Sequence, residues 1–177
     1  MLKKSLSIIS YLTIVVILGL AVRHFATPIN NKPTAISGAA LFSTSLTDTQ
    51  GIKQNLIQYK GKIIVVNFWA TWCPPCREEM PELSLLQQEY QDKNVVVIGI
   101  AEDELAPVKE YLQSSPVTYP IFIADNENMN LGERLGNNKA VLPYTVIINS
   151  DGIVMDTFFG RITKELLENS IRNLLPH

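Results

Sequence analysis

Residues 66–83 read VNFWATWCPPCREEMPEL, and this stretch holds the only two cysteines of the chain, Cys73 and Cys76. Two residues separate them, so their thiols can close one small ring that opens and closes by thiol–disulfide exchange. A structural disulfide usually joins distant segments, because closing a long loop constrains the unfolded chain more. A zinc site needs four ligands, and the chain has no second CxxC motif and histidines only at positions 24 and 177. We therefore interpret the pair as a redox site.

The residues around the pair indicate a buried strand that leads into a helix. Residues 63–68 are almost all apolar and mostly β-branched, as in a strand covered on both faces. Residues 77–91 repeat apolar side chains every three or four positions, which predicts a helix. Pro81 lies inside this helix and should kink it one turn after Cys76.

Farther along the chain, strands and helices alternate and then give way to a hairpin. The expected elements are strands at 95–100 and 119–124 and helices at 104–113 and 128–135. An Asp-Gly step separates the apolar runs 145–149 and 153–159, which predicts the hairpin, and Thr163 can cap a last helix. This order predicts an α/β fold, a three-layer α/β/α sandwich with a mixed central sheet. Residues 41–47 and 52–57 are expected to add an N-terminal β element.

The N-terminus has the pattern of a signal anchor. Lys3 and Lys4 precede residues 5–22, which carry no charge and are rich in Leu, Ile and Val. Eighteen helical residues span roughly 27 Å, close to the roughly 30 Å hydrocarbon core of a bilayer. Residues 20–26 match the small-x-small cleavage pattern poorly, so we expect residues 1–22 to stay as a transmembrane anchor; a cleaved signal peptide is the alternative. The two lysines should stay cytoplasmic, which places the rest of the chain outside.

The remaining chain divides into a linker and one domain. Residues 23–40 contain Pro, Asn, Ser and Gly without periodicity and are expected to tether the domain. Residues 41–177 suffice for a single domain with a sizeable core. The net charge is −2, and no Lys/Arg cluster lies beyond the N-terminus. This composition argues against nucleic acid as a partner.

The stretch 66–83 resembles the active-site segment of the thioredoxin superfamily and, more narrowly, of its membrane-tethered TlpA/ResA/CcmG branch. The similarity in the order of elements extends over residues 41–175. The resemblance implies a thioredoxin-like fold and an extracytoplasmic thiol–disulfide oxidoreductase. Enzymes of this branch are usually reductases and often serve cytochrome c maturation.

The two cysteines take different roles in this interpretation. Cys73 falls where the strand meets the helix, so the helix dipole and free N–H groups should favour its thiolate. We assign to Cys73 the attack on a substrate disulfide and to Cys76, one turn into the helix, the attack that releases the reduced substrate. Pro74 and Pro75 have no backbone N–H, which leaves the Cys73 sulfur chiefly the N–H of Cys76. A less stabilised thiolate favours a more reducing couple, so we expect a reductase.

A proline just before the first strand of the predicted hairpin is the second part of the expected site. In thioredoxin-like folds a cis proline at this place lies beside the CxxC motif, and the resemblance implies the same for Pro143. Leu142 would then offer its backbone for strand-like pairing with a substrate segment. Trp72 is expected on the docking surface, whereas Trp69 is expected in the core. Tyr144 departs from the small or β-branched residue common after this proline.

Acidic residues near the pair are candidates for proton transfer. Resemblance to the ResA branch implies an acid after the second buried strand that shuttles the proton of the second cysteine, and Glu102 and Asp103 lie there. Two solvated acids at the start of a helix are an equal alternative. Glu79 matches a recurring acid in the family's Cys-Arg-x-Glu-x-Pro pattern. For Arg77, Glu78 and Glu79, however, a solvated helix face with local charge pairing explains the sequence at least as well.

The leading hypothesis is a monomeric reductase of disulfides in exported proteins, such as apocytochrome c. An integral membrane thiol donor of the DsbD/CcdA kind would recharge it, because the outer compartment is generally oxidising. We expect no cofactor and no metal. The runner-up is a copper-binding chaperone, since related Sco-like folds pair CxxxC with a downstream histidine; here the spacing is two, and His177 is the only histidine of the domain. A peroxidase would carry its thiol in a different motif, and an isomerase would need a dimerisation domain.

Overall fold

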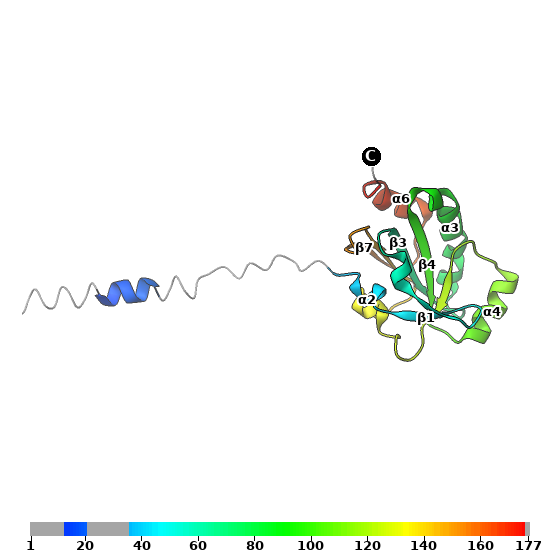
Figure 1. The fold of residues 1–177 in the computed structure, drawn as a ribbon, viewed down its shortest axis with the longest axis horizontal. Helices are drawn as coiled ribbons and strands as arrows, with labels where there is room; N and C mark the ends of the chain where they lie inside the picture. Colours follow the sequence, from blue (N-terminus) through cyan, green and yellow to red (C-terminus); the bar gives the residue numbers. More distant parts are fainter. Residues whose placement is uncertain (1–12, 21–35, 176–177) are drawn as a thin grey trace, which may run out of the picture. The chain divides into compact units, whose positions relative to one another are not determined.

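The computed structural model of the chain describes residues 13–20 and 36–175 (Figure 1). The chain divides into two units, residues 1–34 and residues 35–177. Residues 13–20 are helical. Among the described residues, no helix combines the length and the apolar character that crossing a membrane requires. The rest of the predicted anchor, and the predicted linker as far as residue 35, lie outside the described residues.

One mixed sheet of seven strands forms the centre of the second unit. The strands follow one another across the sheet in the order β2-β1-β5-β4-β3-β6-β7. The central neighbours β3, β4 and β5 run parallel, and all other neighbours pair antiparallel. The strands are β1 (Ser45–Asp48), β2 (Lys53–Asn55), β3 (Ile63–Trp69), β4 (Val95–Ala101), β5 (Ile121–Ile123), β6 (Tyr144–Ile148) and β7 (Val154–Phe159).

Helices cover both faces of this sheet (Figure 1). One face packs against α3, α4 and α6, which contribute Leu83, Val108 and Leu167 to the core. The other face packs against α2, α5 and the 3₁₀ helix η1. The helices are α2 (Ala39–Phe42), α3 (Pro74–Tyr90), α4 (Leu105–Ser114), α5 (Leu131–Arg134) and α6 (Lys164–Arg172), with 3₁₀ helices η1 (Leu56–Tyr59) and η2 (Gln91–Lys93). The predicted α/β/α sandwich with a mixed sheet is confirmed.

The two central strands, β3 and β4, contribute side chains to an apolar core on each face of the sheet. Every residue of β3 and β4 is buried. Because side chains alternate along a strand, Val65 and Val97 face the side of α3, while Val66 and Ile98 face the side of α2 and α5. Each such side chain contributes roughly 1.5–3 kcal/mol when fully buried. The continuous apolar runs in the sequence therefore correspond to strands that stabilise both layers.

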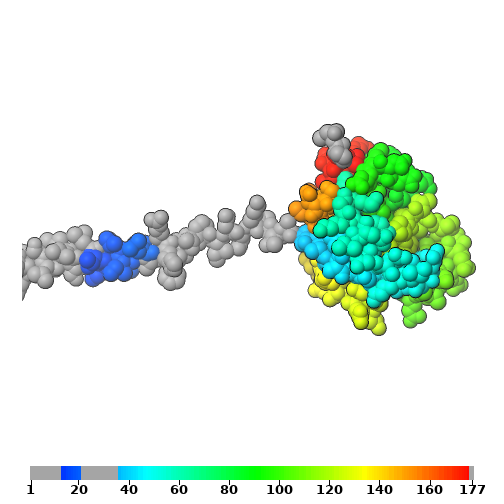
Figure 2. Space-filling model, in the orientation of Figure 1, coloured from blue at the N-terminus to red at the C-terminus, as the bar shows by residue number. Residues whose placement is uncertain are grey.

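The N-terminal part of the domain differs in detail from the expectation. Of the two predicted β segments, 41–47 and 52–57, only β1 and β2 are extended; Leu41 is buried within α2, and Leu56 begins η1. Gly38 N–H donates to Gly152 O at 2.8 Å, so residues that we assigned to the linker pair with the domain. In Figure 2 the segment that carries β1 and β2, coloured cyan, lies on the surface turned toward the viewer.

Helix α3 begins three residues before the predicted start at residue 77. Its first two positions are Pro74 and Pro75, and proline is well suited there because the first helical N–H groups have no partner within the helix. The helix continues through Pro81 to Tyr90. The chain thus passes from the end of β3 to the start of α3 within four residues, and Cys73 lies at that junction.

Candidate active site

The cysteine pair lies where the chain leaves β3 and enters α3. Cys73 is the N-cap residue of α3 and has an extended backbone, and Cys76 belongs to the first turn of the helix. The two sulfurs form a disulfide, and 5.3 Å separates the two Cα atoms. Cys73 keeps 4% of its surface exposed, whereas Cys76 keeps none. A substrate therefore meets the sulfur of Cys73 first.

The start of α3 sets the polar environment of Cys73. Pro74 and Pro75 carry no N–H, so Cys76 is the first residue of the helix with a backbone donor. The positive end of the helix dipole lies at the N-cap residue, which favours a negative charge on Cys73. The site thus combines an attractive dipole with few N–H donors.

The loop before β6 reaches the same end of the sheet. Tyr144 pairs with Phe68 in the antiparallel ladder, which brings Pro143 to the point where β3 ends. The Leu142–Pro143 peptide bond is cis, as the resemblance implies. Pro143 is buried, and its carbonyl accepts a hydrogen bond from Gly160 N–H at 2.9 Å. Among the hydrogen bonds of the described residues, none uses the backbone N–H or C=O of Leu142.

The aromatic residues of this region separate into surface and core. Trp72, next to Cys73, is 68% exposed, whereas Trp69 is fully buried and packs on Tyr111 with 5.6 Å between the ring centroids. Tyr144 is also fully buried, and its hydroxyl donates to Leu135 O at 2.9 Å. Tyr144 therefore packs into the core on the α2 and α5 side of the sheet, away from the cysteine pair.

Glu79 is a buried acid one turn after Cys76. No part of its surface is exposed. One carboxylate oxygen accepts a hydrogen bond from Asn67 Nδ2 at 2.6 Å, and the other accepts from the backbone N–H of Ile162 at 2.9 Å. Burial raises the pKa of Glu79 to about 7, against the opposing effect of the two hydrogen bonds and the charge of Arg161. This carboxyl group can therefore gain or lose a proton near neutral pH.

The interpretation of Glu79 as part of a solvated helix face is wrong. It holds for Glu78, which is exposed and forms an ion pair with Arg161 at 3.1 Å. The sequence carried a signal for the difference, because Glu79 lies three residues after Cys76 and four before Leu83. That spacing places Glu79 on the buried face of α3, where burial of an acid requires hydrogen-bond partners.

Asp103 and Glu102 follow the end of β4 next to each other and differ in their contacts. Asp103 accepts hydrogen bonds from both the backbone N–H and the hydroxyl of Thr71, two residues before Cys73. Its other carboxylate oxygen accepts from Glu104 N–H at 2.9 Å. Asp103 is therefore the acid that contacts the loop of the cysteine pair, and it holds that loop through Thr71.

Glu102 lies on the face covered by α5. A methyl group built on Gly132 would lie 3.6 Å from both Glu102 Oε1 and the ring of Phe68, so the carboxyl group is close to α5. Partial burial raises the pKa of Glu102. The backbone N–H of Glu102 donates to Trp69 O at 2.8 Å, at the end of β3. The proton-shuttle role assigned to Glu102 or Asp103 stays a prediction.

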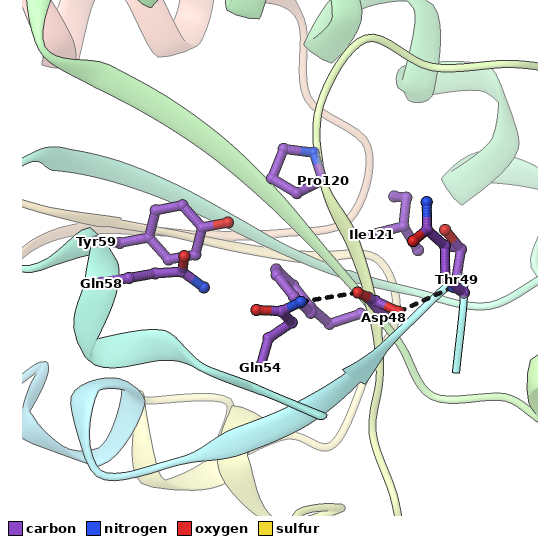
Figure 3. A pocket seen from close by; sticks show the side chains of 9 residues that line it. Asp48, Thr49, Gln54, Gln58, Tyr59, Pro120 and Ile121 are labelled. Carbon is purple, nitrogen blue, oxygen red and sulfur yellow. Dashed lines mark hydrogen bonds between the residues drawn. The ribbon is translucent and has the colours of Figure 1, made fainter. Parts of the chain in front are cut away.

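A polar hollow lies elsewhere, between the β1–β2 turn and the segment that enters β5 (Figure 3). Its acid, Asp48, accepts hydrogen bonds from the backbone N–H groups of Ile52 and Gln50 and from Gln54 Nε2. These bonds, that of Ile52 first, lower the pKa of Asp48. Asp48 is thus engaged in shaping the turn, and the hollow shares no lining residue with the cysteine site. Within the described ranges, no group of three or more His, Cys, Asp or Glu side chains is arranged to hold a metal ion.

Comparison with known sequences places the chain among thiol–disulfide redox proteins. A sequence model of the Redoxin family matches residues 33–175. The chain is 37% identical over 130 residues to the thioredoxin-like protein YneN of Bacillus subtilis, a match that covers 72% of this chain and 74% of YneN. It is 34% identical over 134 residues to the thiol-disulfide oxidoreductase ResA of Bacillus thuringiensis, which covers 74% of each protein.

Solved structures agree with this result. A thiol:disulfide interchange protein of the thioredoxin family from Chlorobium tepidum superposes with a TM-score of 0.68 at 26% identity, over 82% of this chain and 98% of that protein. A thioredoxin-related protein from Neisseria meningitidis serogroup B superposes with a TM-score of 0.67 at 32% identity, over 73% of this chain and 97% of that protein. The fold is therefore thioredoxin-like.

Proposed function

This chain belongs to the Redoxin family as a thiol–disulfide oxidoreductase of the ResA/DsbE type, and we propose that it reduces disulfides in exported proteins. The observation that carries the proposal is the unequal exposure of the two cysteines at the start of α3. Cys73 keeps 4% of its surface exposed next to the exposed Trp72, and Cys76 keeps none. A pair arranged in this way has one sulfur for the substrate and one for release.

The reaction begins with the reduced pair. The Cys73 thiolate attacks one sulfur of the substrate disulfide, a bond forms between them, and the other substrate sulfur leaves as a thiolate that takes a proton from solvent. Cys76 then gives up its proton and attacks the Cys73 sulfur. The mixed disulfide breaks, the second substrate thiolate leaves and is protonated, and Cys73 and Cys76 end as a disulfide. Two electrons have passed from the pair to the substrate.

We assign the acceptance of the Cys76 proton to Glu79. Glu79 lies one turn after Cys76 on the same buried face of α3, and its pKa of about 7 suits a general base at neutral pH. Asn67 and Ile162 N–H hold the carboxylate in place. Asp103, for which the resemblance implied this role as an alternative to Glu102, instead holds Thr71 and hence the loop that carries Cys73.

The direction of reduction is supported by the two prolines. With Pro74 and Pro75 at the start of the helix, few backbone donors stabilise the Cys73 thiolate. A dithiol form that is less stabilised gives up its electrons more readily. The same residues would disfavour a strongly oxidising role.

The surface around Cys73 supports an extended protein segment as the substrate. Leu142 has a free backbone N–H and C=O beside the cis proline, and these groups can pair with a substrate strand. Trp72, the residue before Cys73, offers an exposed aromatic ring. Together they would hold a cysteine-containing segment across the disulfide.

The N-terminal sequence supports a place of reaction outside the cytoplasm. Residues 1–22 have the charge and the apolar run of a signal anchor, which would keep the domain at the outer surface of the membrane. An oxidising compartment requires a supply of electrons, and an integral membrane thiol donor of the DsbD/CcdA kind would provide it. Apocytochrome c is one client of this description. We propose that the protein acts as a monomer.

Trapping of the mixed disulfide tests the proposal. The variant Cys76→Ser cannot release its substrate, so we expect it to accumulate exported proteins bound through Cys73, separable by reductant on a gel. The matched control Cys73→Ser keeps one thiol but lacks the exposed one, and it should trap far less. Equal trapping by both variants, or by neither, would contradict the assignment of attack to Cys73.

A further inference from the structure

Four buried side-chain atoms in the described part of the chain have no hydrogen-bond partner. They are Asn67 Oδ1, Trp69 Nε1, Ser84 Oγ and Tyr119 OH. Buried polar groups in native proteins nearly always have a partner, and an ordered water supplies it where the protein does not. All four atoms belong to α3 or to residues on the sheet face that α3 and α4 cover. Their gathering in one layer calls for a common explanation.

Three of the four atoms belong to residues that surround Gly99. A methyl group built on Gly99 would lie 3.3 Å from Trp69 Nε1 and 3.1 Å from Tyr119 Cε2, so the indole N–H and the edge of the phenol ring are close neighbours. Asn67 is the ladder partner of Gly99 across β3 and β4. The same methyl group would also collide with Ile121 Cδ1, so the polar edges of Trp69 and Tyr119 share the space over Gly99 with an apolar side chain.

The inner end of this cluster is Glu79. Asn67 Nδ2 donates to Glu79 Oε1 at 2.6 Å and to Thr145 Oγ1 at 3.0 Å, which leaves Asn67 Oδ1 without a partner. Tyr119 lies within the electrostatic reach of Glu79, because the charge of Glu79 adds to burial in raising the pKa of Tyr119. The other ionisable groups that act on Glu79 and Tyr119 are Arg161, before α6, and Tyr111, on α4.

The outer end is a groove of about 540 Å³ between α3 and the segment that joins α4 to β5. Ser84 and Tyr111 line it from the two helices. Thr118, beside Tyr119, donates its hydroxyl proton to Ser84 O at 2.9 Å. Tyr111 also packs on Trp69 at 5.6 Å between ring centroids, so it contacts both the groove and the inner cluster. The groove shares no lining residue with the surface formed by Trp72 and Leu142.

We propose that ordered waters join these four atoms into a hydrated route from the α3–α4 groove to Glu79, and that Glu79 exchanges protons with solvent through it. The proposal rests on the proposed role of Glu79 as the base for Cys76. During release, the Cys76 thiol gives its proton to the Glu79 carboxylate, and Glu79 then passes that proton to the waters. A substrate bound over Cys73 covers the pair, and the route opens on another part of the surface. Tyr119 and Ser84 are positioning residues that hold the waters.

A high-resolution crystal structure tests the waters themselves. We expect density for ordered waters within hydrogen-bond distance of Trp69 Nε1, Tyr119 OH and Asn67 Oδ1. A dry cluster in such a map would overturn the proposal, whatever the activity of the protein.

Single-turnover kinetics test the passage of protons. The mixed disulfide of Cys73 with a model peptide is formed, and its release by Cys76 is timed in H₂O and in D₂O. Tyr119→Phe and Ser84→Ala should each slow release, Tyr119→Phe by roughly 10-fold, and should enlarge the solvent isotope effect. The attack of Cys73 on the peptide should not change. Tyr59→Phe is the matched control, because it removes a partly buried phenol hydroxyl on the other face of the sheet, and it should behave as the wild type.

The variant Glu79→Gln separates the possible failures. Slow release by Glu79→Gln together with wild-type release by Tyr119→Phe and Ser84→Ala would overturn the route and leave Glu79 as the base. If Glu79→Gln released its substrate at the wild-type rate, both the hydrated route and the role of Glu79 as the base would be overturned. The route would then lead to a group that accepts no proton.

Discussion

At the scale of single residues, Glu79 has the environment of a working acid–base group. It is fully buried, two hydrogen bonds fix both carboxylate oxygens, and burial brings its pKa to about 7. A buried carboxyl group is costly to ionise, and perturbed pKa values of this kind are common at functional sites, which supports the proposed role of Glu79 as a proton acceptor. Asp103 differs, because its hydrogen bonds tie it to Thr71 and Glu104 near the surface.

The first prediction concerns the pH dependence of substrate release. In the wild type, release by Cys76 should speed up as pH rises through about 7, because Glu79 loses its proton there and becomes able to accept one. Glu79→Gln cannot accept a proton, so release should fall on the order of 100-fold and lose this inflection. Stopped-flow kinetics of the mixed disulfide between pH 5 and 9 measure both effects.

The control for this variant is Glu78→Gln. Glu78 carries the same charge one position earlier but is exposed and paired with Arg161. Its replacement should leave the pH profile unchanged. If Glu79→Gln and Glu78→Gln gave the same pH profile, the assignment of Glu79 as the base for Cys76 would be wrong.

The burial of Glu79 could be predicted from the sequence, but its hydrogen-bond partners could not. The spacing from Cys76 and Leu83 places Glu79 on the apolar face of α3. Nothing local indicates that Asn67, twelve positions earlier, or Ile162, over eighty positions later, supplies its hydrogen bonds. For Asp103, nothing local indicates that Thr71, thirty-two positions earlier, supplies its hydrogen bonds.

At the scale of elements, the start of α3 controls the chemistry of Cys73. The helix supplies its dipole, and Pro74 and Pro75 withhold two N–H groups from the same sulfur. The balance between these effects sets how strongly the thiolate is stabilised. This balance depends on the four consecutive residues Cys73 to Cys76, so the sequence alone could indicate it.

The second prediction changes this balance. Pro75→Thr restores a backbone N–H and adds a hydroxyl near Cys73, so the thiolate should be better stabilised. We expect Cys73 to react with iodoacetamide several-fold faster at pH 6 and the couple to become more oxidising. Pro81→Ala, in the second turn of the same helix, should change neither quantity. A Pro75→Thr variant with wild-type reactivity would show that N–H donors do not set the behaviour of Cys73.

The short N-terminal elements were the least predictable part of the fold. Residues 41–57 carry apolar side chains but form α2, η1 and two strands of three or four residues. Such short elements gain little from intrinsic propensity, and their conformation depends on contacts with distant parts of the chain. The bridge of Ser37 with Ile153 is an example. The long apolar runs of β3 and β4, by contrast, predicted their strands closely. A strand that is buried on both faces must be apolar at nearly every position, and such a run is easy to recognise in a sequence.

At the scale of the whole molecule, the fold assembles the site from three separate segments. The end of β3 and the start of α3 supply the cysteines, the loop before β6 supplies the cis proline, and the loop after β4 supplies Asp103. The order of strands and helices was enough to predict this sandwich, because parallel strands joined by helices leave few arrangements. The N-terminal anchor, residues 1–22, stays a prediction.

The central claim is that this assembly makes a reducing couple, and the reduction potential of the Cys73–Cys76 pair tests it most directly. The domain is equilibrated with defined ratios of reduced and oxidised dithiothreitol or glutathione, and the fluorescence of Trp72, which adjoins Cys73, reports the fraction reduced. We predict a potential close to that of thioredoxin, about −270 mV. A potential near that of DsbA, about −120 mV, would contradict the assignment as a reductase.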